Sequence, residues 1–168
     1  IFGLDYSERA TTFSKIFVPE AMVVTADLKN IPYEDNYFDF IFLIETLEHI
    51  IPDRVTPILK ELSRILKNEG SLVITVPSDY TPAKGKHYQH FSESSLRKNL
   101  EQFFEKIEII GQDKTGFHFL KILDKMIENN FWSIKPLSGW YNNKIWPKYF
   151  NLASPKNCRR LIAKCKSK

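Results

Sequence analysis

The sequence predicts an α/β domain whose sheet is mainly parallel. Short apolar runs alternate with segments of helical spacing, which is the pattern of parallel strands joined by helices. The run Phe40–Ile44 is apolar at every position, as expected for a strand covered on both faces. Asp27 and Glu45 follow two of these runs, and ligands of open parallel sheets lie beyond the carboxyl ends of the strands. A binding site is therefore expected at these strand ends.

The first 50 residues are expected to form three strands, a helix and a helical turn. Ser7 can cap a helix over residues 8–17, and Pro19 stops it. The expected inward face of this helix consists of Ala10, Phe13, Ile16 and Phe17. The runs that predict the strands are 1–4, 23–25 and 40–44. A helical turn after the third strand would carry on one face Glu45, Glu48 and His49.

The middle of the chain continues the alternation of helix and strand. Thr56 and Pro57 form a typical helix start, and Gly70 is expected to stop that helix. Ser92 caps a further helix, whose inward residues are expected to be Leu96, Leu100, Phe103 and Phe104. Strands are predicted at 71–76, 107–110 and 160–165. In the last of these, one face consists of Leu161, Ala163 and Cys165.

The composition is that of an ordinary soluble globular protein with one domain. The chain has 168 residues, of which 43% are hydrophobic, which is enough to bury a core. No apolar run approaches the roughly 20 residues that span a bilayer, and the sequence shows no signal peptide. A cytoplasmic location is therefore predicted. The two cysteines, Cys158 and Cys165, lack metal-ligand spacing and are expected to be free, buried thiols.

Basic residues are concentrated in the last third of the chain. Residues 1–113 carry 12 basic and 18 acidic side chains, whereas residues 114–168 carry 12 basic and 2 acidic ones together with all three tryptophans. We expect a basic, aromatic cap insert at 115–157, before the last strand. One interpretation is a helical cap with solvated lysines; the other is a surface for an acidic partner, such as a phosphate-bearing substrate, an anionic lipid or RNA.

Acidic residues at strand ends indicate a ribose-containing ligand. A carboxylate there can accept two hydrogen bonds from a vicinal diol, and Asp5 fits this role. Asp27 follows the next strand and could accept from an exocyclic amine, with the backbone of Leu28 beside a ring nitrogen. Taken singly, each aspartate is also explained as a turn or helix-cap residue.

Three segments together resemble the class I S-adenosylmethionine-dependent methyltransferases. These are LDYS, ADLKNIPYEDNYFDFIFLIETLEHI and ELSRILKNEGSLVITVP, within residues 1–112. The resemblance implies a Rossmann-like, seven-stranded sheet with an antiparallel last strand. It also implies S-adenosylmethionine as cofactor, bound at the ribose by Asp5, at adenine by Asp27 and the main chain of Leu28, and near its methionyl part by Ile44 and Glu45.

One feature of that family is absent from the sequence. Family members carry a central strand and a glycine-rich loop of the G-x-G-x-G type before the position of Asp5, but no G-x-G occurs among the six glycines here. We expect that the sequence given omits an N-terminal segment with this strand and loop. A naturally shortened, inactive relative is the alternative.

Histidines near the third strand could serve the methyl acceptor. Glu45, Glu48 and His49, joined by His87 or His90, could bind a divalent metal, as the similar E-x-x-E-H arrangement does in some ubiquinone-type and small-RNA methyltransferases. In other relatives, the histidine equivalent to His49 caps or lines the pocket. His90 begins an H-F-S step that borders the acceptor site in many family members. For a hydroxyl acceptor, His49 and His90 are the candidate general bases; a nucleophilic carbon or amine needs none.

The predicted function is methyl transfer from S-adenosylmethionine to a small-molecule, lipid-linked or glycan-linked acceptor. The insert would form the acceptor-side cap, and its aromatic and basic residues would suit peripheral contact with a membrane. An RNA methyltransferase is the second interpretation, because basic charge and aromatic rings also suit single-stranded nucleic acid. A non-catalytic partner subunit with this fold is the third.

Overall fold

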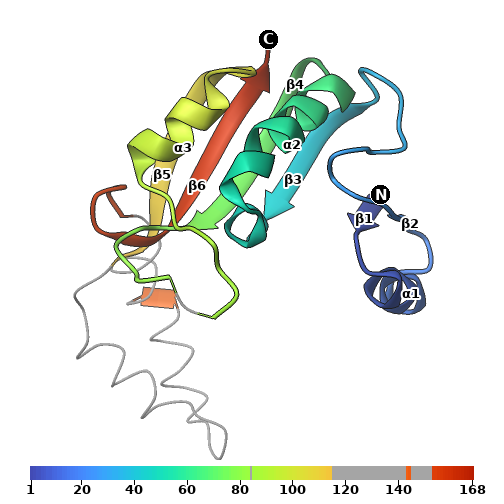
Figure 1. Cartoon of the computed structure of the whole chain (residues 1–168), viewed down its shortest axis with the longest axis horizontal. Coiled ribbons are helices and arrows are strands. Elements are labelled where there is room, and N and C mark those ends of the chain that lie inside the picture. Colours follow the sequence, from blue (N-terminus) through green and yellow to red (C-terminus); the bar gives the residue numbers. More distant parts are fainter. Residues whose placement is uncertain (84, 115–142, 145–152) are drawn as a thin grey trace, which may run out of the picture.

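The computed structural model describes residues 1–83, 85–114, 143–144 and 153–168. Most of the predicted insert at 115–157, including its tryptophans, lies outside these residues. The elements, shown in Figure 1, are β1 (Phe2–Asp5), α1 (Glu8–Phe17), β2 (Met22–Thr25), β3 (Phe38–Ile44), the 3-10 helix η1 (Leu47–His49), α2 (Pro52–Ile65), β4 (Leu66–Pro77), α3 (Glu93–Leu100), β5 (Phe104–Lys114) and β6 (Cys158–Ser167).

The strands form two sheets. β1 and β2 pair in parallel, and a four-stranded sheet has the order β3-β4-β6-β5. In the larger sheet β3 and β4 are parallel, whereas β6 runs antiparallel to both of its neighbours. The predicted α/β class and the antiparallel last strand are therefore confirmed.

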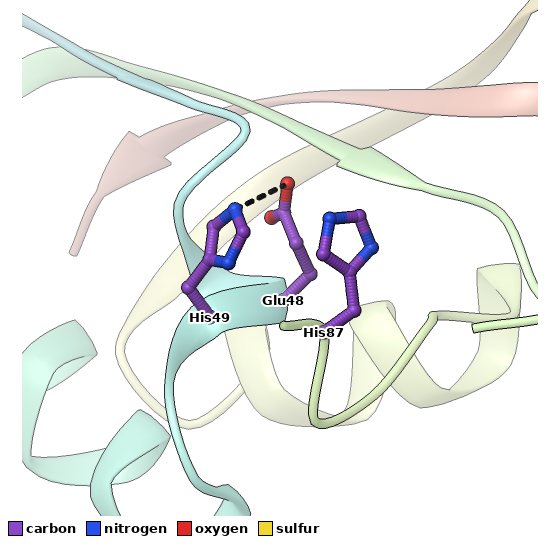
Figure 2. Close-up of side chains that lie close together, drawn as sticks. All are labelled: Glu48, His49 and His87. Carbon is purple, nitrogen blue, oxygen red and sulfur yellow. Dashed lines mark ion pairs between the residues drawn. The ribbon is translucent and has the colours of Figure 1, made fainter. Parts of the chain in front are cut away.

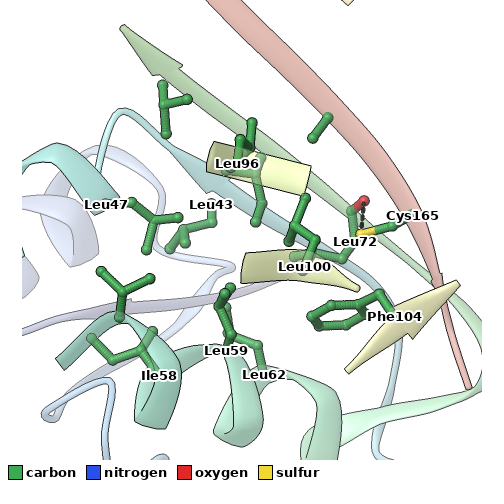
Figure 3. Close-up of a cluster of buried hydrophobic side chains, with 14 of the residues drawn as sticks. Leu43, Leu47, Ile58, Leu59, Leu62, Leu72, Leu96, Leu100, Phe104 and Cys165 are labelled. Atoms are coloured by element: carbon green, nitrogen blue, oxygen red, sulfur yellow. Dashed lines mark hydrogen bonds between the residues drawn. The ribbon is translucent and has the colours of Figure 1, made fainter. Parts of the chain in front are cut away.

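The core lies between the four-stranded sheet and two helices. Figure 1 shows α2 and α3 side by side on one face of this sheet. Figure 3 shows the apolar side chains that meet there. Helix α2 contributes Leu59 and Leu62, and α3 contributes Leu96 and Leu100, all of them buried. Burial of each such side chain is worth about 1.5–3 kcal/mol. No described helix is long and apolar enough to cross a membrane.

Helix α2 begins and ends earlier than predicted. It starts at Pro52 and includes Thr56 and Pro57, which were expected to start it. Burial of Val55 explains the extension, because Val55 lies one turn before Leu59 and so continues the apolar face of the helix toward its start. Gly70 does not stop the helix but lies inside β4, where an added Cβ would stand 2.7 Å from the side chain of Leu66.

Two surfaces that were expected to be buried are exposed. Helix α1 has the predicted bounds and the Ser7 cap, yet Phe13, Ile16 and Phe17 on its expected inward face are 56–73% exposed. On β3 the alternate side chains are exposed, so that strand is covered on one face only. These side chains are Phe40, Phe42 and Ile44. Among the described residues, none covers either surface.

A hollow separates the two sheets. It has a volume of about 620 Å³ and is lined by residues of β1 and β3, mostly apolar. Phe2 of β1 contacts Phe38 of β3 edge to face, with ring centroids 5.3 Å apart. Leu28 and Ile31 also line the hollow. Because β1 pairs only with β2 and β3 only with β4 among the described strands, each presents an unpaired edge.

Candidate functional site

The two aspartates lie at the same end of the small sheet. Asp5 ends β1, where it pairs in register with Thr25, and Asp27 follows two residues later. The backbone N–H of Ala26 donates to the carbonyl oxygen of Asp5 at 3.1 Å. The two aspartates therefore lie at the ends of adjacent, parallel strands.

Each aspartate also has a local structural role. Oδ1 of Asp5 accepts from the N–H of Ser7 at 2.7 Å. Oδ1 of Asp27 accepts from the N–H of Lys29 at 2.9 Å, and its Oδ2 lies 3.7 Å from the Lys29 ammonium. The turn interpretation is thus confirmed for one oxygen of each carboxylate. The cofactor-binding roles of Asp5, Asp27 and Leu28 stay predictions.

Glu45 occupies a strained position at the end of β3. Its φ is 46°, a region that non-glycine residues rarely adopt outside special sites. Its N–H donates to the carbonyl oxygen of Thr75 at 3.0 Å. Its carboxylate accepts from Arg160 Nε at 3.0 Å and from Nη2 at 3.5 Å. From the sequence, Glu45, Glu48 and His49 were expected to share one helical turn. Glu45 lies outside that turn, so this expectation was wrong.

Glu48, His49 and His87 form a compact cluster. Their ligand atoms all lie within 4.8 Å of one another. Figure 2 shows the Glu48 carboxylate between the two rings, with His49 and Glu48 on η1 and His87 on the loop after β4. The N–H of Tyr88 donates to the Glu48 carbonyl oxygen at 2.8 Å, which fastens this loop to η1. Of the two candidate partners, His87 joins the cluster.

His90 supports the cluster from outside. Its Nε2 lies 2.8 Å from Nδ1 of His87, and its Nδ1 hydrogen-bonds to the carbonyl oxygen of Thr81. Both ring nitrogens are therefore engaged. The predicted role of His90 as a general base stays a prediction, and among the described residues the more accessible candidate is His49, whose side chain is 46% exposed.

The electrostatics of the cluster centre on Glu48. Its side chain is only 1% exposed, and Oε2 has no hydrogen-bond partner. Burial raises the pKa of the Glu48 carboxyl above its ordinary value. A buried carboxylate without a donor is costly unless a cation or proton accompanies it. Arg160 and Thr81 also shape the site. The sequence carried no signal for Arg160, because its contact with Glu45 spans 115 positions, or for Thr81, because its contact with His90 depends on how their loop folds.

The amino-terminal part of the chain matches a known domain family. Residues 1–74 fit the model of the family described as methyltransferase domain. The chain is 29% identical over 153 residues to an uncharacterized protein of Methanocaldococcus jannaschii, covering 85% of this chain and 66% of the relative. It is 33% identical over 84 residues to the demethylmenaquinone methyltransferase of Staphylococcus saprophyticus, covering 48% of this chain and 35% of the relative.

A solved structure extends the similarity over nearly the whole chain. The match is a S-adenosylmethionine-dependent methyltransferase from Thermotoga maritima, described as a possible histamine N-methyltransferase. At 17% identity, the alignment covers 99% of this chain and 72% of that one, with a TM-score of 0.68. The chain has the class I S-adenosylmethionine-dependent methyltransferase fold. The resemblance seen in the sequence is thereby confirmed.

The position of the hollow can be compared with the order of strands in the class I methyltransferase fold. In the family resemblance, the strand that carries the glycine-rich loop is central in the sheet and precedes the position of Asp5. Here the hollow lies between the unpaired edges of β1 and β3, in the middle of the set of strands.

The chain spans 66% of the length of the relative from M. jannaschii and 35% of the length of the relative from S. saprophyticus.

Proposed function

We propose that the protein transfers a methyl group from S-adenosylmethionine to a small-molecule, lipid-linked or glycan-linked acceptor. The observation that carries the proposal is the position of three acidic residues at the strand ends of a methyltransferase fold: Asp5 ends β1, Asp27 lies two residues after β2, and Glu45 directly follows β3. Ligands of open α/β sheets bind at such strand ends.

The residues at these strand ends fit the chemistry of the cofactor. Among the described residues, none hydrogen-bonds Oδ2 of Asp5, which leaves that oxygen able to accept from a ribose hydroxyl. Leu28, half-buried beside Asp27, offers its main chain and an apolar side chain to adenine. Ile44 is 54% exposed and supplies an apolar surface for the methionyl chain.

Methyl transfer from a sulfonium depends mainly on position. Placing the acceptor in line with the methyl group supplies much of the rate. η1 begins two residues after Glu45, so Glu48 and His49 lie on the segment that leaves the cofactor end of β3. His49 is the residue we assign to deprotonate a hydroxyl acceptor there.

A small or lipid-like acceptor is favoured over RNA. The relative from S. saprophyticus is named as a demethylmenaquinone methyltransferase. The excess of basic over acidic residues after position 113, together with the tryptophans, suits an acceptor with a phosphate or a lipid tail. An RNA acceptor would make binding strongly dependent on salt, which gives a simple means to distinguish the two.

The hollow is where we place the strand and glycine-rich loop of the family. Its lining is mostly apolar, and the edges of β1 and β3 offer unpaired N–H and C=O groups to a strand between them. The exposed rings of Phe40 and Phe42 and the exposed face of α1 are the surfaces that a following helix would cover. A longer form of the protein with this segment would hold the complete cofactor site.

The test is calorimetric titration of S-adenosylhomocysteine into the chain and into a longer form that carries a glycine-rich loop. We expect micromolar binding to the longer form, and much weaker or no binding to the chain alone. Saturable binding followed by methylation of a quinone or phenol would support the acceptor class. Absence of binding in both forms would overturn the proposal in favour of a non-catalytic subunit.

A further inference from the structure

The cluster of Glu48, His49 and His87 has a hydrogen-bond environment that fixes the protonation of its rings. The carbonyl oxygen of Thr81 can only accept, so Nδ1 of His90 must donate to it. In a neutral His90, Nε2 is then an acceptor, and the proton of the 2.8 Å bond belongs to Nδ1 of His87. Nε2 of His87 is left with a free lone pair.

A different contact holds the proton of the His49 ring on Nδ1, as in His87. Its Nδ1 lies 3.4 Å from the carbonyl oxygen of Lys86, which can only accept. Nδ1 therefore carries a proton, and in the neutral ring Nε2 faces Oε1 of Glu48 at 3.9 Å with its lone pair. Figure 2 shows a ring nitrogen of each histidine directed toward the Glu48 carboxylate.

With both rings neutral and Glu48 ionised, only acceptors meet inside this cluster. Two imidazole lone pairs face a carboxylate that is almost fully buried, and Oε2 of that carboxylate has no hydrogen-bond partner. The other carboxylate of the segment, Glu45, accepts a hydrogen bond from Arg160. An arrangement of this kind is stable when a cation fills its centre, because each lone pair then has a partner.

We propose that Glu48, His49 and His87 bind one divalent first-row transition-metal ion. Two imidazole nitrogens and one carboxylate form the ligand set of catalytic zinc sites and of sites for iron and related ions. Mg²⁺ and Ca²⁺ prefer oxygen ligands and fit this set poorly. Ligands of one such ion stand about 2.0–2.2 Å from it, so the three ligand atoms, which now lie within 4.8 Å of one another, would move closer together when the ion binds.

His90 and Thr81 complete the site as positioning residues. A metal-bound histidine commonly donates its other N–H to an acceptor, which orients the ring. His87 does so through His90, and His90 is oriented in turn by Thr81. When the ion is bound, His49 is a ligand and no longer a general base, and the ion would hold the acceptor oxygen in its place. Binding of the ion itself needs no cofactor.

The test uses the protein without a histidine tag, freed of metal with EDTA and titrated with Co²⁺. We expect one Co²⁺ per chain, visible absorption bands from nitrogen and oxygen ligands, and displacement by Zn²⁺ but not by Mg²⁺. Glu48→Gln, His49→Ala and His87→Ala should each abolish the bands. His90→Ala should weaken the affinity by about 10–100-fold, the usual effect of losing an outer partner.

Two matched variants separate this site from other binding. Glu45→Gln, on the same segment, and His118→Ala, which removes the remaining histidine of the chain, should both keep the Co²⁺ spectrum. Because the His49 ring is 46% exposed, His49→Ala tests the site even if Glu48→Gln fails to fold. No saturable binding, or binding that survives all three ligand variants, would overturn the proposal. Titration with S-adenosylhomocysteine is a separate readout, so failure here leaves the methyltransferase proposal standing.

Discussion

Glu45 and Arg160 form a two-point ion pair although 115 positions separate them in the sequence. Glu45 ends β3, and Arg160 lies on β6 opposite Pro77 of β4. The pair therefore bridges β4 and ties the end of β3 to the last strand. It also holds the one acidic side chain that the resemblance places beside the methionyl part of the cofactor.

This ion pair is expected to contribute little to stability. Both side chains are about one third or more exposed, and exposed ion pairs are worth about 0.2–1 kcal/mol. A double-mutant cycle with Glu45→Gln and Arg160→Gln, measured by urea denaturation, should give a coupling free energy in that range. A coupling energy above about 2 kcal/mol would show that the pair is effectively shielded from water.

The two strand-end aspartates should affect cofactor binding separately. In the form of the protein that binds S-adenosylhomocysteine, Asp5→Asn and Asp27→Asn should each lower the affinity by about tenfold or more, because each removes a charged hydrogen-bond acceptor. Asp39→Asn, near the opposite end of β3 and paired with Lys67, is the matched control. Equal affinity in all four proteins would contradict the assigned roles.

Acid should weaken the attachment of the loop before β3. Arg64 donates to both oxygens of Glu61 and to the carbonyl oxygens of Ile31 and Tyr33. The pKa of Glu61 is lowered, and the largest cause is the hydrogen bond from Arg64. The contribution of the Glu61–Arg64 interaction to the free energy of unfolding is therefore fully present above the pKa of Glu61 in the unfolded chain, near 4.5. It is lost as the pH falls through the lower pKa of the folded state.

Glu61→Gln should remove this pH-dependent contribution and lower the free energy of unfolding by about 2 kcal/mol at neutral pH. Free energies of unfolding measured between pH 3 and pH 7 test this, with Glu20→Gln at an exposed position as control. An unchanged slope of stability against pH in Glu61→Gln would refute it.

The two thiols should be inert in the folded protein. Cys158 and Cys165 are free and buried, and burial raises the pKa of Cys165 to about 12. Since the thiolate is the reactive form, a thiol reagent at pH 8 should modify Cys165 slowly in buffer and rapidly in urea. Fast reaction in buffer would mean that β6 opens readily.

Gly111 should not tolerate a side chain. An added Cβ would stand 2.7 Å from the carbonyl oxygens of both Ala153 and Ser154, which are backbone atoms and cannot turn aside. Gly111→Ala should lower the free energy of unfolding by about 1–3 kcal/mol. Gly3→Ala is the matched control, because its nearest neighbour would lie at an ordinary 3.4 Å. Equal stability of the two variants in urea would contradict the expectation.

Features set by neighbouring residues were predicted best from the sequence. The Ser7 cap, the bounds of α1 and the Ser92 cap of α3 are confirmed, since each depends on hydrogen bonds within a few residues. The buried face of β6 is also confirmed at Leu161, Ala163 and Cys165, because alternation along a strand follows directly from its geometry.

Features that depend on distant partners were not predictable. The exposure of Phe40 and Phe42 reflects which elements cover β3, and an apolar run does not contain that information. The turn of Glu45 toward Arg160 depends on β6 lying two strands away. The choice of His87 over His90 was open in the sequence, and the fold of their loop decides it.

The unpaired edges of β1 and β3 also bear on how this chain would behave at high concentration. Open strand edges are templates on which strands of other molecules add, and here two of them face one apolar hollow with exposed phenylalanines beside it. Amide protons of β1 should exchange with solvent far sooner than those of the doubly paired β4. The same opening would make the chain prone to self-association and aggregation.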